Sequence, residues 1–173
     1  MIQNLLRLLN LIDALSLWSG RSVAWLTLVA VLILTAEVVR RYFFNAPTQW
    51  AHEVSTLLFG LLYVLAGAYA LKEKAHVGVD VFYSRLSRKG QAWFNLLGFV
   101  FLTLFAGTLV VYGWKFFLAS WQNREFSLAN QAIPIFPFKL AIPLGAALLL
   151  LQGLANAIRD LLVLLGKEED RAH

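Results

Sequence analysis

Cysteine is absent from this chain, and charged residues are scarce. Among its 173 residues there is no cysteine, and Asp, Glu, Lys and Arg together make up only 14%. The absence of cysteine excludes disulfides, thiolate nucleophiles and thiolate metal sites. The low charge excludes an ordinary soluble enzyme or domain, in which about 25% of residues are charged. It also excludes a disordered tail, which needs high charge and few apolar residues.

Hydrophobic side chains take the place of the missing charge. They make up 60% of the chain, whereas a soluble domain has roughly 45–50%. This is more apolar surface than a soluble core of this size can bury, so the class is a polytopic membrane protein. The net charge of +5 does not indicate a nucleic-acid partner, because basic residues beside apolar runs orient membrane proteins.

Four apolar stretches are long enough to cross a membrane, which takes about 20 residues in a helix. They cover residues 22–43, 50–71, 92–118 and 138–165. We find no internal repeat and no linker that would divide the chain, so residues 1–173 are predicted to form one four-helix membrane domain. The predicted fold class is an all-α integral membrane protein with four transmembrane helices and short interfacial amphipathic helices.

The segments outside the spans are predicted to lie at the membrane surface. Residues 1–21 contain no cleavage site typical of a signal peptide. Their polar side chains, including Gln3 and Arg7, share one helical face, which favours an interfacial amphipathic helix. Residues 79–89 show apolar residues at helical spacing and are predicted to form a second, shorter one. Residues 166–173 are predicted to be a solvated tail.

The distribution of Lys and Arg predicts the topology, because cytoplasmic loops carry the excess of positive charge. Ten lie on the side of the two termini: Arg7, Arg21, Lys72, Lys74, Arg85, Arg88, Lys89, Arg159, Lys167 and Arg171. Five lie on the other side: Arg40, Arg41, Lys115, Arg124 and Lys139. Both termini are therefore predicted to be cytoplasmic, in a bacterial or archaeal cytoplasmic membrane. The 44–49 turn and the 119–137 connection are predicted to face outward.

Carboxylates inside the spans are the default candidates for function. Glu37 is the deepest and permits two interpretations. It is either a coupling carboxylate for protons or substrate, or a local partner of Arg40 or Arg41 at the i+3 and i+4 positions. The local pair is the favoured interpretation. Glu53 opens the second span, where it either stabilises the helix N-terminus or meets the same arginines across the turn.

The histidines do not predict a haem or metal site. His52 and His76 are 24 residues apart, which is about 36 Å along one helix, so they lie at opposite faces of the bilayer. The chain also shows neither a Ser–His–Asp order nor a metal-ligand spacing typical of enzymes. We therefore expect no catalytic residue, no metal and no cofactor.

Small residues at helical spacing predict close helix packing, because they let membrane helices approach one another. Pro143 lies near the start of the fourth span, where a proline is tolerated. The other candidates are Gly60 and Gly67 in the second span and Ala141, Gly145, Gly153 and Ala157 in the fourth.

Three motifs resemble a known family. The stretch RYFFNAPTQWAHE from Arg41 to Glu53 is similar to R-Y-x-x-N-x-P-x-x-W-x-x-E in the small membrane subunit of TRAP transporters, the DctQ-like family. HVGVD, from His76 to Asp80, resembles the family's H-[IV]-x-V-D, and a proline pair before P-L-G resembles its entry to the last span. The resemblance covers residues 22–165. By analogy, the outer turn is shaped by Arg40, Arg41, Asn45, Pro47, Trp50 and Glu53, and the cytoplasmic turn by His76 and Asp80.

The resemblance implies a tripartite ATP-independent periplasmic transporter, in which this chain is the small, non-catalytic subunit. Such a system is sodium-driven and takes up an organic acid, a carboxylate or similar anion, delivered by a periplasmic binding protein. The implied partners are a large multi-span permease subunit, which this chain stabilises, the binding protein, which it helps to dock, and membrane lipid. No nucleic acid is implied. We also expect the large subunit to bury the small-residue face of one span.

Two alternatives stay open from the residues alone. One is a self-sufficient, homo-oligomeric four-helix exporter that uses Glu37 as a proton-coupled carboxylate. The other is a membrane anchor of a redox complex, against which the histidine spacing argues. Secondary transporters usually bind substrate between helices broken near the middle of the membrane. The four apolar stretches contain no such pair of breaks, and this favours a subunit over a complete transporter.

Overall fold

The computed structural model describes residues 2–73, 83, 85–127 and 133–166. Four helical segments are long and apolar enough to cross a membrane, which confirms the all-α fold with four spans. Residues His76 and Asp80, and part of the helix predicted over 79–89, lie outside the described residues. The helices are α1 (Ile2–Phe43), α2 (Ala51–Lys72), α4 (Arg88–Gln122), α5 (Phe136–Lys139) and α6 (Ala141–Leu164).

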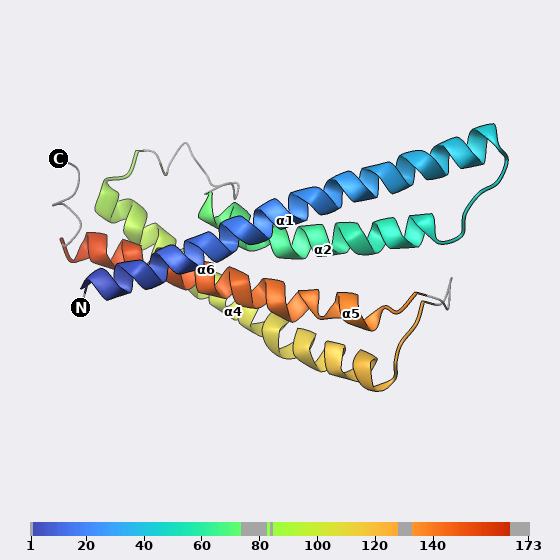
Figure 1. Ribbon diagram of the computed structural model, residues 1–173. Helices are drawn as coiled ribbons and strands as arrows, with labels where there is room; N and C mark the ends of the chain where they lie inside the picture. Colours follow the sequence, from blue (N-terminus) through green and yellow to red (C-terminus); the bar gives the residue numbers. More distant parts are fainter. Residues whose placement is uncertain (1, 74–82, 84, 128–132, 167–173) are drawn as a thin grey trace.

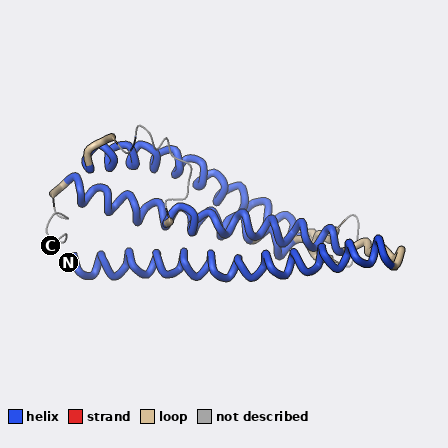
Figure 2. The backbone as a smooth tube through the Cα atoms, turned by 90° about the horizontal axis from the view of Figure 1, so that it is seen from above, coloured by secondary structure: helices blue, strands red, loops and turns tan. Residues whose placement is uncertain are grey.

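The first helix is much longer than a single membrane span requires. α1 has 42 residues, or about 63 Å at 1.5 Å per residue, and it runs without interruption along the whole molecule (Figure 1 and Figure 2). The prediction of a separate interfacial helix over residues 1–21 is therefore wrong. No proline interrupts the helix there, and Gly20 lies against the Tyr69 ring of α2. A glycine in such a contact permits close helix packing rather than ending the helix.

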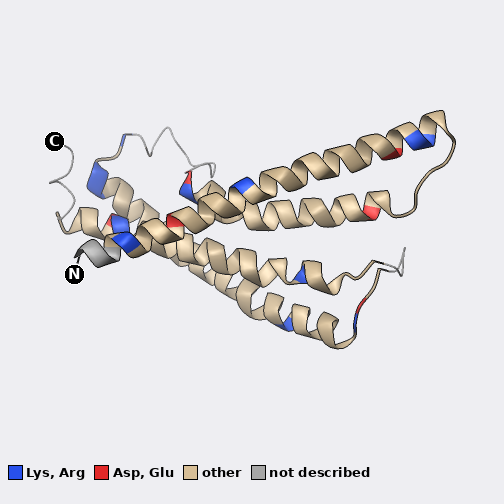
Figure 3. Ribbon diagram, viewed as in Figure 1, with Lys and Arg blue, Asp and Glu red and all other residues tan. Residues whose placement is uncertain are grey.

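The helices pair as two hairpins, α1 with α2 and α4 with α6, and α2 packs beside α6 to join them (Figure 1). α1 begins and α6 ends near one another, and we call this side of the molecule the termini end. The opposite side, with the 44–50 turn and the connection between α4 and α5, is the loop end. Each span contains a long stretch without charged residues, although α1 carries charges as far as its middle (Figure 3).

Small residues bring α6 into close contact with both of its neighbours. A Cβ atom at Gly145 would lie 2.7 Å from the Val64 carbonyl oxygen of α2. A Cβ atom at Gly153 would overlap the Leu102 side chain of α4. From the sequence, we expected the large subunit to bury the small-residue face of one span. That assignment is wrong for this face of α6, because the chain's own helices already cover it.

The remaining packing candidates divide into two groups. In α6, Ala141, Pro143 and Ala157 are buried beside the glycines described above. In α2, a Cβ built at Gly67 would lie 3.8 Å from Leu149 Cδ1, an ordinary contact, whereas Gly60 is exposed with open space around it. Gly60 therefore takes no part in packing within the described residues.

Candidate functional site

The Glu37 carboxylate is held entirely by its own hairpin. The side chain is 6% exposed, and its Oε1 atom accepts a hydrogen bond from Arg41 Nη2 at 2.9 Å. The backbone N–H of Thr48 donates to Oε2 at 3.0 Å, and the Thr48 hydroxyl donates to the same oxygen. The i,i+4 partner of Glu37 is thus Arg41. Through its bonds to Thr48, Glu37 also links the end of α1 to the turn that leads into α2.

The turn between α1 and α2 is shaped so that Thr48 reaches Glu37. The Arg40 carbonyl accepts hydrogen bonds from the backbone N–H groups of Phe44 and Ala46, at 3.2 and 3.1 Å. Asn45 has a φ of 48°, a left-handed conformation that asparagine tolerates better than most residues.

Two predicted residues, Pro47 and Trp50, complete the turn. Pro47 restricts the backbone φ just before Thr48, and Trp50 precedes the first residue of α2 and stays exposed. Sequence analysis missed Thr48, although its place directly after the proline of the motif was a usable signal.

Glu53 lies in the first turn of α2, where the first of its two interpretations placed it, and its side chain makes a contact that neither interpretation named. Its Oε1 atom accepts a hydrogen bond from the hydroxyl of Ser127, a buried residue in the connection after α4. The Glu53 Oε2 atom is buried and has no hydrogen-bond partner among the described residues. The contacts that the structure gives Glu53 therefore join α2 to the α4–α5 connection, and not to Arg40 or Arg41.

The α4–α5 connection has its own ion pair. Lys139 Nζ binds Glu125 Oε2, and the Ser120 hydroxyl donates to the same oxygen at 2.7 Å. These two donors hold the pKa of the Glu125 carboxyl below its ordinary value of 4.5. The backbone N–H of Ser127 donates to the Ile133 carbonyl at 2.9 Å. The ion pair and this bond position the segment that carries Ser127.

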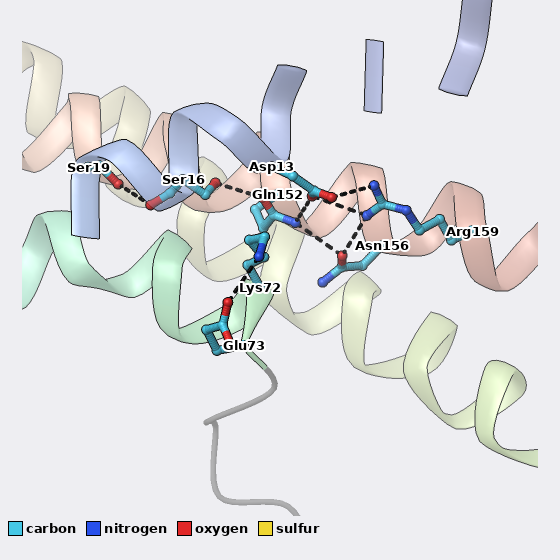
Figure 4. Close-up of polar contacts among 8 residues, drawn as sticks. All are labelled: Asp13, Ser16, Ser19, Lys72, Glu73, Gln152, Asn156 and Arg159. Carbon is cyan, nitrogen blue, oxygen red and sulfur yellow. Dashed lines mark hydrogen bonds and ion pairs between the residues drawn. The ribbon is translucent and has the colours of Figure 1, made fainter. Parts of the chain in front are cut away.

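A second polar site joins α1 to α6 (Figure 4). Asp13 accepts two hydrogen bonds from the Arg159 guanidinium, Nη2 to Oδ2 at 2.7 Å and Nη1 to Oδ1 at 3.2 Å. Gln152 Nε2 donates to Asp13 Oδ1 at 2.9 Å, and the Ser16 hydroxyl donates to Gln152 Oε1 at 2.6 Å. Asn156 Oδ1 accepts from both Gln152 and Arg159. We call these five residues the α1–α6 polar cluster.

Sequence analysis did not single out this cluster. Asp13 and Ser16 are three residues apart, and Gln152, Asn156 and Arg159 follow a spacing of four and three, so each set shares one helical face. That spacing was the available signal, although it does not say which helix lies opposite. Because Gln152 is fully buried and its amide is hydrogen-bonded, the cluster is suited to fastening two helices rather than to exchanging protons.

The described residues place no metal or haem ligands together. His52 is exposed on α2, and the other two histidines lie outside the described residues. In the part of the chain that the structure describes, no group of three His, Asp or Glu side chains is placed to hold a metal ion. The described polar sites show hydrogen bonding and charge pairing within α1 and its turn, between α2 and the α4–α5 connection, and between α1 and α6.

The four long apolar helices define a multi-pass membrane protein. Residues 30–163 match the family profile described as tripartite ATP-independent periplasmic transporters, DctQ component. Because the match covers most of the chain, this protein belongs to that family. Members of the family are transport components rather than enzymes, and this chain is accordingly a multi-pass transport component of the inner membrane.

Two curated relatives illustrate the similarity. The C4-dicarboxylate TRAP transporter small permease protein DctQ of Rhodobacter capsulatus is 32% identical over 100 residues, which are 58% of this chain and 44% of that protein. The sialic acid TRAP transporter small permease protein SiaQ of Vibrio cholerae is 24% identical over 134 residues, 78% of this chain and 76% of that protein. The matched region thus spans less than half the length of the first relative.

Proposed function

We propose that this chain is the non-catalytic scaffold subunit of a sodium-driven, binding-protein-dependent transporter for an organic acid. The observation that carries the proposal is the pairing of Glu37 and Asp13 within the chain, each with an arginine of its own. A coupling carboxylate must exchange its partners in every transport cycle. A carboxylate that fastens two segments of the same chain must keep them, so the pairing supports a scaffold.

The remaining components follow from the same proposal. A large multi-span permease subunit holds the substrate and sodium sites, and a periplasmic binding protein docks near the loop end of this chain. The lysine and arginine bias supports this direction, with both termini in the cytoplasm. The two relatives are named for C4-dicarboxylate and sialic acid, which are both organic acids and support that substrate class.

The alternative of a lone exporter is less well supported. It needs Glu37 to titrate freely, whereas Arg41 and Thr48 together surround both carboxylate oxygens. Glutamine at this position still accepts hydrogen bonds but loses the charge. The scaffold proposal therefore expects Glu37→Gln to lower the melting temperature of the complex while uptake per folded complex persists.

Reconstitution into liposomes tests the proposal directly. The purified chain alone is expected to move no organic acid, whereas the chain with its large subunit and binding protein is expected to support sodium-dependent uptake. Initial uptake rates are normalised to folded complex. Transport by the lone chain, or complete loss of uptake in Glu37→Gln at wild-type abundance, would favour the exporter instead.

A further inference from the structure

A hollow at the loop end of the first hairpin has an apolar and a polar half. It has a volume of about 230 Å³ and lies between α1 and α2. Leu34 and Val38 line the half that lies toward the middle of α1, and Arg41, Tyr42 and His52 line the half that lies toward the 44–50 turn. Aliphatic side chains thus give way to a guanidinium, a phenol and an imidazole over about two helical turns, or about 11 Å.

The hollow lies where the uncharged part of α1 ends. Residues 22–36 contain no charged side chain, and Glu37, Arg40 and Arg41 follow within five residues. A helix that crosses a bilayer brings its charged residues toward the interface, where tyrosine and tryptophan are also enriched. We therefore expect the polar half of the hollow at the level of the headgroups and its apolar half beside the acyl chains. A phospholipid has its polar and apolar parts in the same order.

Arg41 is held in position but keeps donors for a ligand. Its Nε and Nη2 atoms both donate to Glu37 Oε1, at 3.3 and 2.9 Å, whereas a guanidinium has five N–H donors. The Arg41 side chain is 54% exposed, and His52 is also exposed. Planar guanidinium groups bind phosphate oxygens through pairs of parallel hydrogen bonds. Glu37 thus orients a group that suits a phosphate.

The charge of the hollow favours an anionic headgroup. Glu37 is 6% exposed, and Arg41 and Thr48 already donate to its two oxygens. An ammonium group therefore finds no accessible carboxylate among the residues that line the hollow. Arg40, next to Arg41, is exposed as well. Two arginines against one covered carboxylate leave a net positive charge, which attracts a headgroup of net negative charge.

The end of α1 beside the hollow has side chains typical of a lipid interface. Tyr42, Phe43 and Phe44 are 72–81% exposed. Consecutive helical residues differ by about 100° in direction, so Tyr42 and Phe43 point to different sides of α1. A partner helix covers one stripe of a helix, whereas the interface of a bilayer surrounds it and accommodates aromatic side chains on every side. This arrangement favours lipid over a protein segment as the occupant of the hollow.

We propose that the hollow binds an anionic phospholipid, with the phosphate at Arg41 and His52 and an acyl chain along Leu34 and Val38. The proposed orientation of the chain places this lipid in the outer leaflet, and the site itself does not depend on the scaffold function. Inorganic phosphate offers the same oxygen atoms but no hydrocarbon for the apolar half. Tight binding therefore requires both parts of one lipid molecule.

Native mass spectrometry of the purified chain in detergent tests the proposal, because it counts bound lipid directly. Phosphatidylglycerol is the anionic probe, phosphatidylethanolamine the zwitterionic one and inorganic phosphate the soluble one. We expect one phosphatidylglycerol to bind more tightly than phosphatidylethanolamine, and inorganic phosphate not to be retained. Equal retention of the two lipids would overturn the preference for an anionic headgroup. Retention of inorganic phosphate would show an anion site that does not need a lipid.

Arg41→Gln tests the polar half of the hollow. Glutamine can still donate to Glu37 but carries no charge, so we expect phosphatidylglycerol to bind about tenfold more weakly. The control is Arg124→Gln, which removes an exposed arginine from the α4–α5 connection and should leave the affinity unchanged. Equal losses in the two variants would indicate general charge attraction and overturn the site.

Val38→Phe tests the apolar half and leaves the pair of Glu37 and Arg41 intact. Val38 is 52% exposed, so the larger side chain fills the hollow without entering the core, and we expect about tenfold weaker binding of phosphatidylglycerol. The control is Val39→Phe, at a neighbouring exposed position that does not line the hollow. Normal binding by Val38→Phe would overturn the proposal. Displacement of the lipid by the purified large subunit would assign the hollow to a protein partner and leave the scaffold function standing.

Discussion

At the scale of single residues, three covered polar side chains make contacts between segments that are separated in sequence. Glu37 reaches Thr48 across the turn, Glu53 reaches Ser127 of the α4–α5 connection, and Gln152 reaches Ser16 of α1. In a low-dielectric environment an unpaired polar group is costly, so such contacts favour one arrangement of the helices over others. In this chain, these hydrogen bonds help to determine which segments of the sequence pack against one another.

Ser16→Ala tests the α1–α6 polar cluster at this scale. The change leaves Gln152 Oε1 without its donor in a fully buried site, which should cost about 1–3 kcal/mol in the free energy of unfolding. The control is Ser19→Ala, because the Ser19 hydroxyl donates to the Ser16 carbonyl of its own helix. Denaturation in mixed detergent micelles compares the two. Equal losses would show that the cluster does not fasten α1 to α6.

At the scale of helices, α6 organises the molecule because it contacts both hairpins. Its glycines lie against α2 on one side and α4 on the other, and its polar residues meet α1. Close approach through small residues replaces the hydrophobic driving force, which is absent between helices in lipid. α6 is therefore the element whose substitution should damage the fold most.

Gly145→Ala tests this role of α6. The added Cβ would lie 2.7 Å from the Val64 carbonyl oxygen, which is backbone and moves only with its helix. We expect a loss of about 1–3 kcal/mol in the free energy of unfolding. Gly98→Ala, in open space on α4, should instead be neutral or stabilise by about 0.5–1 kcal/mol through helix propensity. A neutral Gly145→Ala would contradict the close contact of α2 with α6.

The α4–α5 connection gives a prediction about pH. The Lys139 and Ser120 donors lower the pKa of Glu125 in the folded chain, and unfolding returns it to the ordinary value. The stabilisation is therefore complete above about pH 4.5 and is lost as the pH falls through the lower, folded value. We expect the wild type to melt above Glu125→Gln at neutral pH and the two to converge in acid. A difference that stays constant with pH would contradict this role.

At the scale of the whole molecule, the two hairpins are fastened near both ends and in the middle. The α1–α6 polar cluster holds the termini end, the contact of Glu53 with Ser127 holds the loop end, and Gly145 lies between them. Large apolar side chains such as Trp25 remain widely exposed. The molecule is thus braced internally, and its exposed apolar side chains suit a membrane environment.

The orientation of the molecule is testable with reporter fusions. The bias of ten basic residues against five predicts that fusions after Ala46 and after Glu125 report the periplasm. Fusions after Lys89 and at His173 should report the cytoplasm. Alkaline phosphatase and fluorescent protein activities read the two sides. A periplasmic signal at His173 would indicate an odd number of spans and contradict the four-span fold.

The number and type of the spans could be predicted from the sequence, because hydropathy depends only on local composition and on the thickness of the bilayer. The turn motif around Asn45 and Pro47 was also readable, since backbone restrictions are local. The i,i+4 spacing of Glu37 and Arg41 suggested their ion pair, because helical neighbours follow from the helix period.

Only the tertiary structure decided which distant segments meet. Sequence analysis separated residues 1–21 from the first span, because an amphipathic pattern looks the same whether a helix lies on lipid or on another helix. No partner of Asp13 could be predicted from the sequence, because Gln152 and Arg159 lie about 140 residues away. Gly60 and Gly145 were both predicted to pack closely against another helix, although Gly60 is exposed and Gly145 is buried. Small residues permit close approach, but the partner is chosen by the packing of the whole chain.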